Sequence, residues 1–330
     1  TGDSSRKVVV LDAATERVVR EIPTASTPRV LAWDAIRGRL LVVEDDLIEA
    51  FAPGEGLYEL AASVASDLTG ATSAEFDVRN DRLLVAALAS EPMGVLDTSA
   101  FTFSRASITL DSPQQILIDV PTRRLFVPEP SAAERTRPPR LRILSADTFA
   151  VQKIITGDVF HTAYSPVRDR LYMVSPWTTT LYAIDTATDQ WTYAAVGVTP
   201  WSLALDEQRE LLYVANANSP FLSRVDLSQV VSGYYPTSPI TVPLLARTVA
   251  LDTGRERAYA VAYGQSAASV IDTLSGTLLG TYSVGASPAY AVVDTGTGKL
   301  VTSNYGGGSP REPAPTPIPL SRSLMNRLNW

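Results

Sequence analysis

The chain has 330 residues with a formal net charge of −7, 45% hydrophobic residues and no cysteine. Without cysteine it has no disulfides, thiolate nucleophiles, iron–sulfur clusters or cysteine-type zinc sites. Its acidic balance argues against nucleic acid, whose binding depends on Lys and Arg contacts to phosphate. No uninterrupted apolar stretch approaches the roughly 18–20 residues that a membrane helix needs, so we expect neither a membrane span nor a nucleic-acid partner.

The N-terminal segment VVVLDAATERVVREI, from Val8, predicts two strands joined by a turn, because apolar residues alternate and β-branched residues are frequent. Next comes the Asp-centred hairpin LAWDAIRGRLLVV, from Leu31: an apolar run, an Asp, a short polar stretch and a second apolar run. This hairpin pattern recurs along the chain with its anchor residue at Asp34, Asp77, Asp119, Ser165, Asp206, Asp252 and Asp294.

The anchors follow one another at intervals of 41 to 46 residues. A period of about 40–45 residues built from short strands is typical of a β-propeller, in which each repeat is one blade. We name the two hairpin strands A and B. The Asp side chain is suited to accept hydrogen bonds from backbone amides of the A–B turn, so we interpret the anchors as turn-forming and not as catalytic.

Each hairpin is followed by a second strand pair, C and D, as in YAIDTATDQWTYAAV from Tyr182; only the copy from Leu47 is degenerate. The N-terminal segment supplies a C–D pair with no A–B pair before it, and residues 289–303 supply an A–B pair with no C–D pair after it. Joining these halves completes one blade and removes exposed strand edges. The predicted fold is all-β: a seven-bladed β-propeller over residues 1–305, with four antiparallel strands per blade.

Residues 306–330 differ in composition, since a Gly-rich and then Pro-rich stretch is typical of an extended segment. Near-helical spacing of Leu324, Met325, Leu328 and Trp330 ends this tail. We expect the end to dock either on the propeller's own flank or on a partner.

The phrases ASVIDT (Ala268–Thr273) and YVANANS (Tyr213–Ser219), with the recurring Asp-x-x-x-x-Arg-Leu-Tyr-Val, resemble the bacterial YVTN-type, WD40-like β-propeller repeat family across residues 6–305. That family and its relatives include surface-layer and cell-surface proteins, subunits of periplasmic redox enzymes, lactonases and lyases, so the resemblance does not select one function. A cysteine-free, acidic, repeat-built chain also suits a bacterial periplasmic or extracellular protein.

The D–A and B–C loops share one face of the propeller, which we call the top, and ligands usually bind at that mouth of the channel. Five residues before the anchors lie Arg29, Thr72, Gln114, Phe160, Trp201, Arg247 and Ala289. His161 and Tyr290 lie one residue further on, and the B–C loops add Glu44, Glu129, Trp177, Asn216, Tyr263 and Asn304. Apolar walls with a few convergent polar groups are typical of a small-molecule pocket.

Two hypotheses follow for this top cup. In the first it binds a small anionic or aromatic ligand, or a protein partner, because Arg29 and Arg247 suit bidentate contacts with a carboxylate or phosphate. In the second it is a metal-independent lyase, lactonase or cyclase, in which the two arginines stabilise an oxyanion and His161 or Glu44 moves the proton. A non-catalytic subunit of a periplasmic complex is a third possibility.

Structural roles compete with each of these assignments. The arginines can pair with Glu44 and other acids of the top face, His161 can be structural, and Trp177 and Trp201 can serve inter-blade packing. The run Glu44–Asp46 is either a hard-cation site or a solvated acidic loop. Because a single histidine excludes a two-His centre, the sequence predicts no metal and no other cofactor.

Two insertions interrupt the repeat. Residues 129–140 lengthen a top loop, as a lid, an anion-contacting flap or a solvated loop. Residues 229–239 lengthen a bottom loop, where we expect Tyr234 and Tyr235 to be exposed. Exposed tyrosines are frequent interface anchors, so these two residues, with Trp330, are the predicted partner-binding residues.

Overall fold

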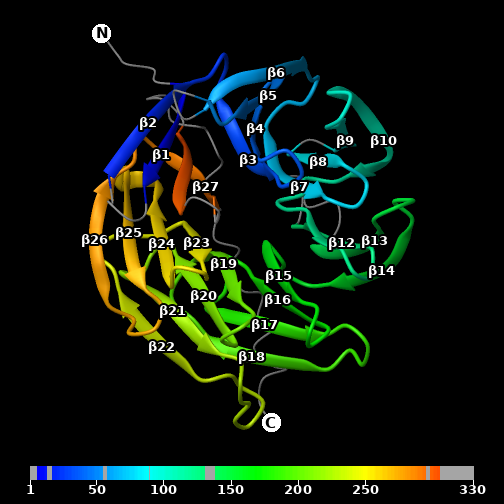
Figure 1. Cartoon of the computed structure of the whole chain (residues 1–330). Helices are drawn as coiled ribbons and strands as arrows, with labels where there is room; N and C mark the ends of the chain where they lie inside the picture. Colours follow the sequence, from blue (N-terminus) through cyan, green and yellow to red (C-terminus); the bar gives the residue numbers. More distant parts are fainter. Residues whose placement is uncertain are drawn as a thin grey trace.

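The computed structural model describes residues 6–12, 17–54, 58–88, 90–130, 138–294 and 298–304. Within them, 28 strands and one 3₁₀-helix of three residues are arranged as seven four-stranded sheets around a central channel (Figure 1). No helix in this part of the chain is long and apolar enough to cross a membrane. The seven-bladed all-β fold predicted from the repeats is confirmed.

Blades are numbered by the order of their A strands, and each sheet has its strands in the order A–B–C–D. Blade 1 contains β3 (Pro28–Asp34), β4 (Arg39–Glu44), β5 (Leu47–Ala52) and β6 (Glu59–Ala65). Blade 2 contains β7 (Ala71–Asp77), β8 (Arg82–Ala87), β9 (Glu91–Asp97) and β10 (Thr102–Leu110). Blade 3 contains β11 (Leu117–Asp119), β12 (Arg124–Glu129), β13 (Arg140–Ser145) and β14 (Val151–Thr156).

The next three blades repeat this order. Blade 4 contains β15 (His161–Ser165), β16 (Arg170–Val174), β17 (Thr180–Asp185) and β18 (Trp191–Ala195). Blade 5 contains β19 (Pro200–Asp206), β20 (Leu211–Asn216), β21 (Phe221–Asp226) and β22 (Thr237–Thr241). Blade 6 contains β23 (Thr248–Asp252), β24 (Arg257–Ala262), the 3₁₀-helix η1 (Tyr263–Gln265), β25 (Ala267–Asp272) and β26 (Leu278–Ser283).

Blade 7 joins the two ends of the chain. Its strands are β27 (Pro288–Asp294), β28 (Lys299–Asn304), β1 (Lys7–Asp12) and β2 (Arg17–Pro23). Strands β1 and β28 are antiparallel, with a register that runs from Lys7 opposite Asn304 to Asp12 opposite Lys299. The predicted closure of the ring is therefore confirmed, and it pairs the strand edge that an open array would leave exposed.

The anchors of blades 1, 4, 5 and 6 accept hydrogen bonds from backbone amides of their A–B turns, as expected. The anchors of blades 2 and 3 instead accept from side chains of the turn, Asn80 and Thr122. The Asp34 carboxylate accepts hydrogen bonds from the backbone amides of Ile36 and Arg37 at 3.1 and 3.0 Å, and the Ser165 hydroxyl does the same for Arg168 at 3.1 Å. The fourth residue after each anchor has a positive φ, and these residues are Gly38, Asp81, Arg123, Asp169, Glu210, Glu256 and Gly298. Only two of the seven are glycines. The side-chain hydrogen bonds to the turn help to hold the other five in a left-handed conformation that disfavours them.

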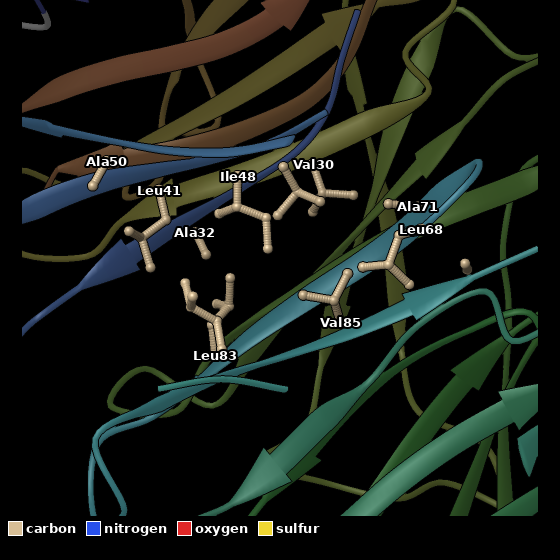
Figure 2. Close-up of a cluster of buried hydrophobic side chains, with 12 residues drawn as sticks. Val30, Ala32, Leu41, Ile48, Ala50, Leu68, Ala71, Leu83 and Val85 are labelled. Atoms are coloured by element: carbon tan, nitrogen blue, oxygen red, sulfur yellow. The ribbon is translucent and has the colours of Figure 1, made fainter. Parts of the chain in front are cut away.

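The hydrophobic core lies between the blades and not at the centre of the ring. Each of the seven junctions between adjacent blades contains one apolar cluster of the described residues. Figure 2 shows the junction of blades 1 and 2, where Ile48 and Leu41 of blade 1 lie opposite Leu83 and Val85 of blade 2. Because this packing lies between the blades, the mouth of the channel is lined by a separate set of polar and aromatic side chains.

Candidate functional site

A cavity of about 280 Å³ lies where the A strands begin, at the top mouth of the channel. All seven residues five positions before the anchors line it, so the equivalence of the repeats places them around one space. Its predicted lining residues are Arg29, Gln114, His161, Trp201, Arg247, Tyr263 and Tyr290. Among the described lining residues none is a carboxylate, although the chain as a whole is acidic.

Arg247 is the cation that the cavity wall holds most firmly. Its guanidinium carbon lies 3.9 Å from the ring centroid of Trp201 and 5.2 Å from that of Tyr263. Cation–π contacts use the flat faces of the guanidinium, whereas its N–H donors lie in the plane of the group. The rings therefore orient Arg247 through the flat faces of its guanidinium.

Arg29 has a different environment. Its guanidinium makes two hydrogen bonds to the Asp45 carboxylate, at 2.6 and 3.1 Å. The alternative of a charge-neutralising pair thus holds for Arg29, but the partner is Asp45 and not Glu44. The Asp45 carboxylate therefore offsets the positive charge of Arg29 at the cup.

His161 lines the cavity as an uncharged side chain. Burial lowers the pKa of His161 to about 4, and its Nδ1 atom has no hydrogen-bond partner in the described part of the chain. No carboxylate there orients or polarises the imidazole. A neutral ring with so low a pKa has little tendency to take up a proton near pH 7.

Four polar residues of the predicted site lie outside the cavity lining: Glu44, Glu129, Asn216 and Asn304. Each ends a B strand and is fully buried. Glu44 accepts a hydrogen bond from the Ser26 amide, and Glu129 accepts one from the Asp111 amide at 2.7 Å. These side chains therefore support the preceding D–A loops from within the blades.

The two asparagines support the same loops through close packing. A Cβ atom built on Gly197 would lie 2.6 Å from Cγ of Asn216, and one built on Gly285 would lie 3.1 Å from Cγ of Asn304. The D–A loop passes so close to Asn216 that only glycine fits at position 197. The strand-end asparagine and the loop glycine thus form one structural unit in each of these blades.

The acidic run at Glu44 does not converge on a cation. Glu44 faces the backbone of Ser26, while Asp45 pairs with Arg29. Glu129 is similarly engaged, in ion pairs with Arg140 at 2.7 Å and with Arg142. The described residues contain no cluster of three His, Asp or Glu side chains that could hold a metal ion.

The aromatic residues divide between wall and support. Phe160 lies edge-on to Trp201, with ring centroids 4.8 Å apart, and Trp177 lies on Phe160 at 6.0 Å, outside the cavity lining. The Tyr290 hydroxyl donates to the Thr72 carbonyl, and this bond joins blades 7 and 2, which are not neighbours in the ring. Trp177 therefore supports the wall, whereas Tyr290 ties one side of the mouth to another.

Glu75, which the sequence analysis missed, lies on β7 three residues after Thr72. Burial raises the pKa of Glu75 to about 7. A hydrogen bond from the Ile118 backbone acts in the opposite direction, because it favours the ionised carboxylate, but its effect is smaller. The equivalent positions, two residues before the other anchors, are all apolar: Ala32, Leu117, Ala163, Ala204, Ala250 and Val292. The sequence signal that could have identified Glu75 is that it is the single acid among seven equivalent positions of the repeat.

The bottom loop exposes only one of its two tyrosines. Tyr234 is 55% exposed, whereas Tyr235 is 4% exposed and its hydroxyl accepts a hydrogen bond from Arg170. The expected exposure of Tyr235 was wrong, because the loop binds along β18 through the Tyr193 backbone and so turns Tyr235 inward onto Tyr172. Trp330 and residues 131–137 lie outside the described residues.

No family model and no curated protein matches the chain. Two solved structures are similar in fold. A chain of Kuenenia stuttgartiensis hydrazine synthase has a TM-score of 0.68 at 11% identity, covering 86% of this chain and 95% of that one. A functionally unknown protein from Desulfotomaculum acetoxidans DSM 771 has a TM-score of 0.70 at 12% identity, covering 85% and 93%. At these identities the likeness shows the propeller fold alone.

Proposed function

We propose that the chain is an extracytoplasmic bacterial propeller of the YVTN type whose top cup binds a small anion with an aromatic or apolar part. The observation that carries this proposal is Arg247, stacked on Trp201 and Tyr263 in the wall of a cavity that no described carboxylate lines. An incoming carboxylate or phosphate would meet a preoriented guanidinium, and its apolar part would meet aromatic rings.

Binding is favoured over catalysis because the cup lacks a suitable proton carrier among the candidates. Glu44 lies outside the cavity lining, and His161 has a pKa of about 4, which makes it a weak base. An enzyme of the lyase, lactonase or cyclase type would need one of these groups to move a proton. We therefore assign His161 to ligand contact as a neutral imidazole.

Membership of a larger extracytoplasmic complex is the second candidate function. It is favoured by the exposed Tyr234 on the bottom loop, and a structural neighbour is a chain of hydrazine synthase. A non-catalytic subunit would use the bottom loop or the tail for its partner, which leaves the cup available for a ligand.

The test is calorimetric titration of the full chain with acetate, benzoate and phenyl phosphate, each beside its uncharged counterpart acetamide, benzamide or phenol. We expect at least one anion to bind and its neutral counterpart to bind at least 10-fold more weakly, on the scale of a charge-assisted hydrogen bond of about 1.5–3 kcal/mol. Arg247→Gln should weaken the binding of that anion by a similar factor.

Arg79→Gln is the matched control, because Arg79 is exposed on the A–B turn at the opposite end of the channel. It removes the same charge and should leave anion affinity unchanged. Equal losses in both variants would mean that net charge and not the cup attracts the anion. Failure of every anion to bind the wild-type chain would overturn the proposal.

A further inference from the structure

A second cavity, of about 370 Å³, opens on the outer flank between blades 3 and 4. We call it the flank pocket, and it is separate from the cup because the two share no lining residue. Its walls come from the D–A loop that enters blade 4 and from one face of that blade: Thr156, Gly157, Asp158, Val159, Met173, Tyr182, Trp191 and Tyr193.

Tyr182 stands nearly at right angles to the two other aromatic rings of the flank pocket, those of Trp191 and Tyr193. Tyr182 and Trp191 have ring centroids 6.5 Å apart at an interplanar angle of 88°, and Tyr182 and Tyr193 are 5.9 Å apart at 80°. Perpendicular rings turn faces and edges toward a shared space, which is the geometry of an aromatic cage and not of a flat stacking platform. Such cages bind organic cations.

Asp158 supplies a negative charge at the same pocket. Its carboxylate is exposed and has no hydrogen bond or ion pair with any residue in the described part of the chain. The surrounding walls raise the pKa of Asp158 by desolvation. A cation in the pocket would reverse that effect by favouring the ionised form.

Blade 2 provides an internal reference for this arrangement. Asp67 occupies the position of Asp158, because each lies two residues after the last paired residue of the preceding D strand, Ala65 or Thr156. Within blade 2, Arg105 on the D strand is the register partner of Gly94 on the C strand. Within blade 4, Tyr193 on the D strand is the register partner of Tyr182 on the C strand in the same way. Two residues earlier on the same strands, Phe103 takes the position of Trp191.

In blade 2 the chain fills the equivalent space with its own guanidinium. Arg105 donates to the Asp67 carboxylate at 2.9 Å and lies over the Phe103 ring, 5.8 Å from its centroid. In blade 4 the acid and the aromatic wall are retained as Asp158 and Trp191, but the arginine is replaced by Tyr193. Blade 4 thus keeps two of the side-chain partners that hold Arg105, the acid and the aromatic ring, but not Glu91, whose position is taken by Thr179.

We propose that the flank pocket binds an external guanidinium group, held between the Asp158 carboxylate and the rings of Tyr182, Trp191 and Tyr193. The group would occupy the place that Arg105 fills in blade 2. The site is independent of the cup, and its ligand has the opposite charge. The guanidinium could belong to an arginine side chain in a polypeptide or to a free small molecule.

The experiment titrates the full chain with N-acetyl-arginine N-methylamide and with the citrulline counterpart, which is nearly isosteric but uncharged. We expect the arginine compound to bind at least 10-fold more tightly. Asp158→Asn should weaken the binding of the arginine compound by 10-fold or more, and Trp191→Leu should weaken this binding several-fold. Asp67→Asn, the same change at the matched position of blade 2, should leave the affinity unchanged.

Tyr193→Arg is a second, independent variant, because it rebuilds the blade 2 arrangement in blade 4. The new side chain should occupy the pocket and abolish binding while the melting temperature stays at or above that of the wild type. Equal binding of the citrulline compound, or full retention of affinity in Asp158→Asn, would overturn the proposal, as would failure of the arginine compound to bind.

Ethylguanidinium distinguishes the two sources of the group. If it binds as tightly as the arginine compound, the pocket recognises the guanidinium alone and suits a free small molecule. If it binds at least 10-fold more weakly, the pocket also contacts the flanking peptide groups and suits an arginine in a polypeptide. Either result supports the site.

Discussion

At the scale of single residues, the most unusual electrostatic feature is a pair of buried carboxyl groups in blade 1. Glu44 is fully buried at the end of β4, and Glu49 on β5 is 5% exposed. Burial, together with a hydrogen bond from Glu44 to Glu49, raises the pKa of Glu44 to about 8. Glu44 therefore carries a proton at neutral pH, because a charged Glu44 would be desolvated and would lie beside a second carboxyl group.

Glu44→Gln should stabilise the protein at alkaline pH and leave it nearly unchanged at pH 4. A folded pKa raised above the unfolded value gives stability that is fully present below about pH 4.5 and is lost as pH rises through about 8. Glutamine keeps an acceptor for Ser26 and a donor for Glu49 but has no charge. We expect its free energy of unfolding at pH 9 to exceed that of the wild type by on the order of 2 kcal/mol.

Urea unfolding at pH 4, 7 and 9 measures this difference. Glu21→Gln serves as the control, because Glu21 is exposed and paired with Lys7, and its effect should not grow with pH in the alkaline range. A Glu44→Gln protein less stable than the wild type at every pH would contradict the assignment of a protonated Glu44.

The residue scale also shows how far the sequence predicts the site. Alignment on the anchors placed Arg29, Gln114 and Arg247 around one cavity, because equivalent positions of a closed ring must converge. The same alignment could not show that Glu44 and Asn216 turn into the blades. Polar residues at strand ends serve a loop backbone as readily as a ligand, and only the path of the D–A loop distinguishes these roles.

At the scale of strands and turns, arginines of the A–B turns join one blade to the next. These inter-blade pairs span five successive junctions: Arg37–Asp81, Arg123–Asp77, Arg124–Asp169, Arg168–Glu210 and Arg209–Glu256. They lie at the end of the channel opposite the cup. Ion pairs therefore join neighbouring blades at the bottom rim, whereas apolar packing joins them along the rest of each junction.

Arg123→Met should be the most destabilising change in this set. Arg123 makes two hydrogen bonds of 2.8 Å to Asp77, whose side chain is fully buried. Removing one partner of a buried pair leaves a poorly compensated charge, which costs about 3 kcal/mol where other donors remain. Chemical denaturation at pH 7 measures the loss.

Lys153→Met provides the comparison, because Lys153 and Asp189 also join two blades but have side chains that are 34% and 59% exposed. Exposed pairs contribute about 0–1 kcal/mol, so this variant should remain near the wild type. Equal effects of the two substitutions would mean that burial does not set the strength of these pairs.

The strands and turns were easier to predict from the sequence than the pockets that they form. The A–B hairpin pattern recurs in every blade, so a single sequence contains seven observations of the same hairpin. The flank pocket has no such support, because it depends on one blade differing from another. Its signal, Tyr193 where blade 2 has Arg105, becomes visible only when both strands are placed in register.

At the scale of the whole molecule, stability depends on closing the ring through blade 7. The N-terminal strands β1 and β2 cover β28 and contribute Val8, Val10 and Ile22 to the apolar cluster shared with blade 1. Each blade contacts mainly its neighbours, as in other repeat proteins, so one missing pair of strands exposes one junction and one strand edge.

Deleting residues 1–23 should therefore cause loss of cooperative unfolding and association through the exposed β28 edge. A circular permutant that starts at residue 24 and carries residues 6–23 after residue 305 tests the cause, because Lys7 already lies opposite Asn304 and needs only a short link. It should recover the wild-type melting temperature and remain monomeric by light scattering. A stable monomer from the N-terminal deletion alone would show that six complete blades and a half-blade suffice, against the role argued for closure.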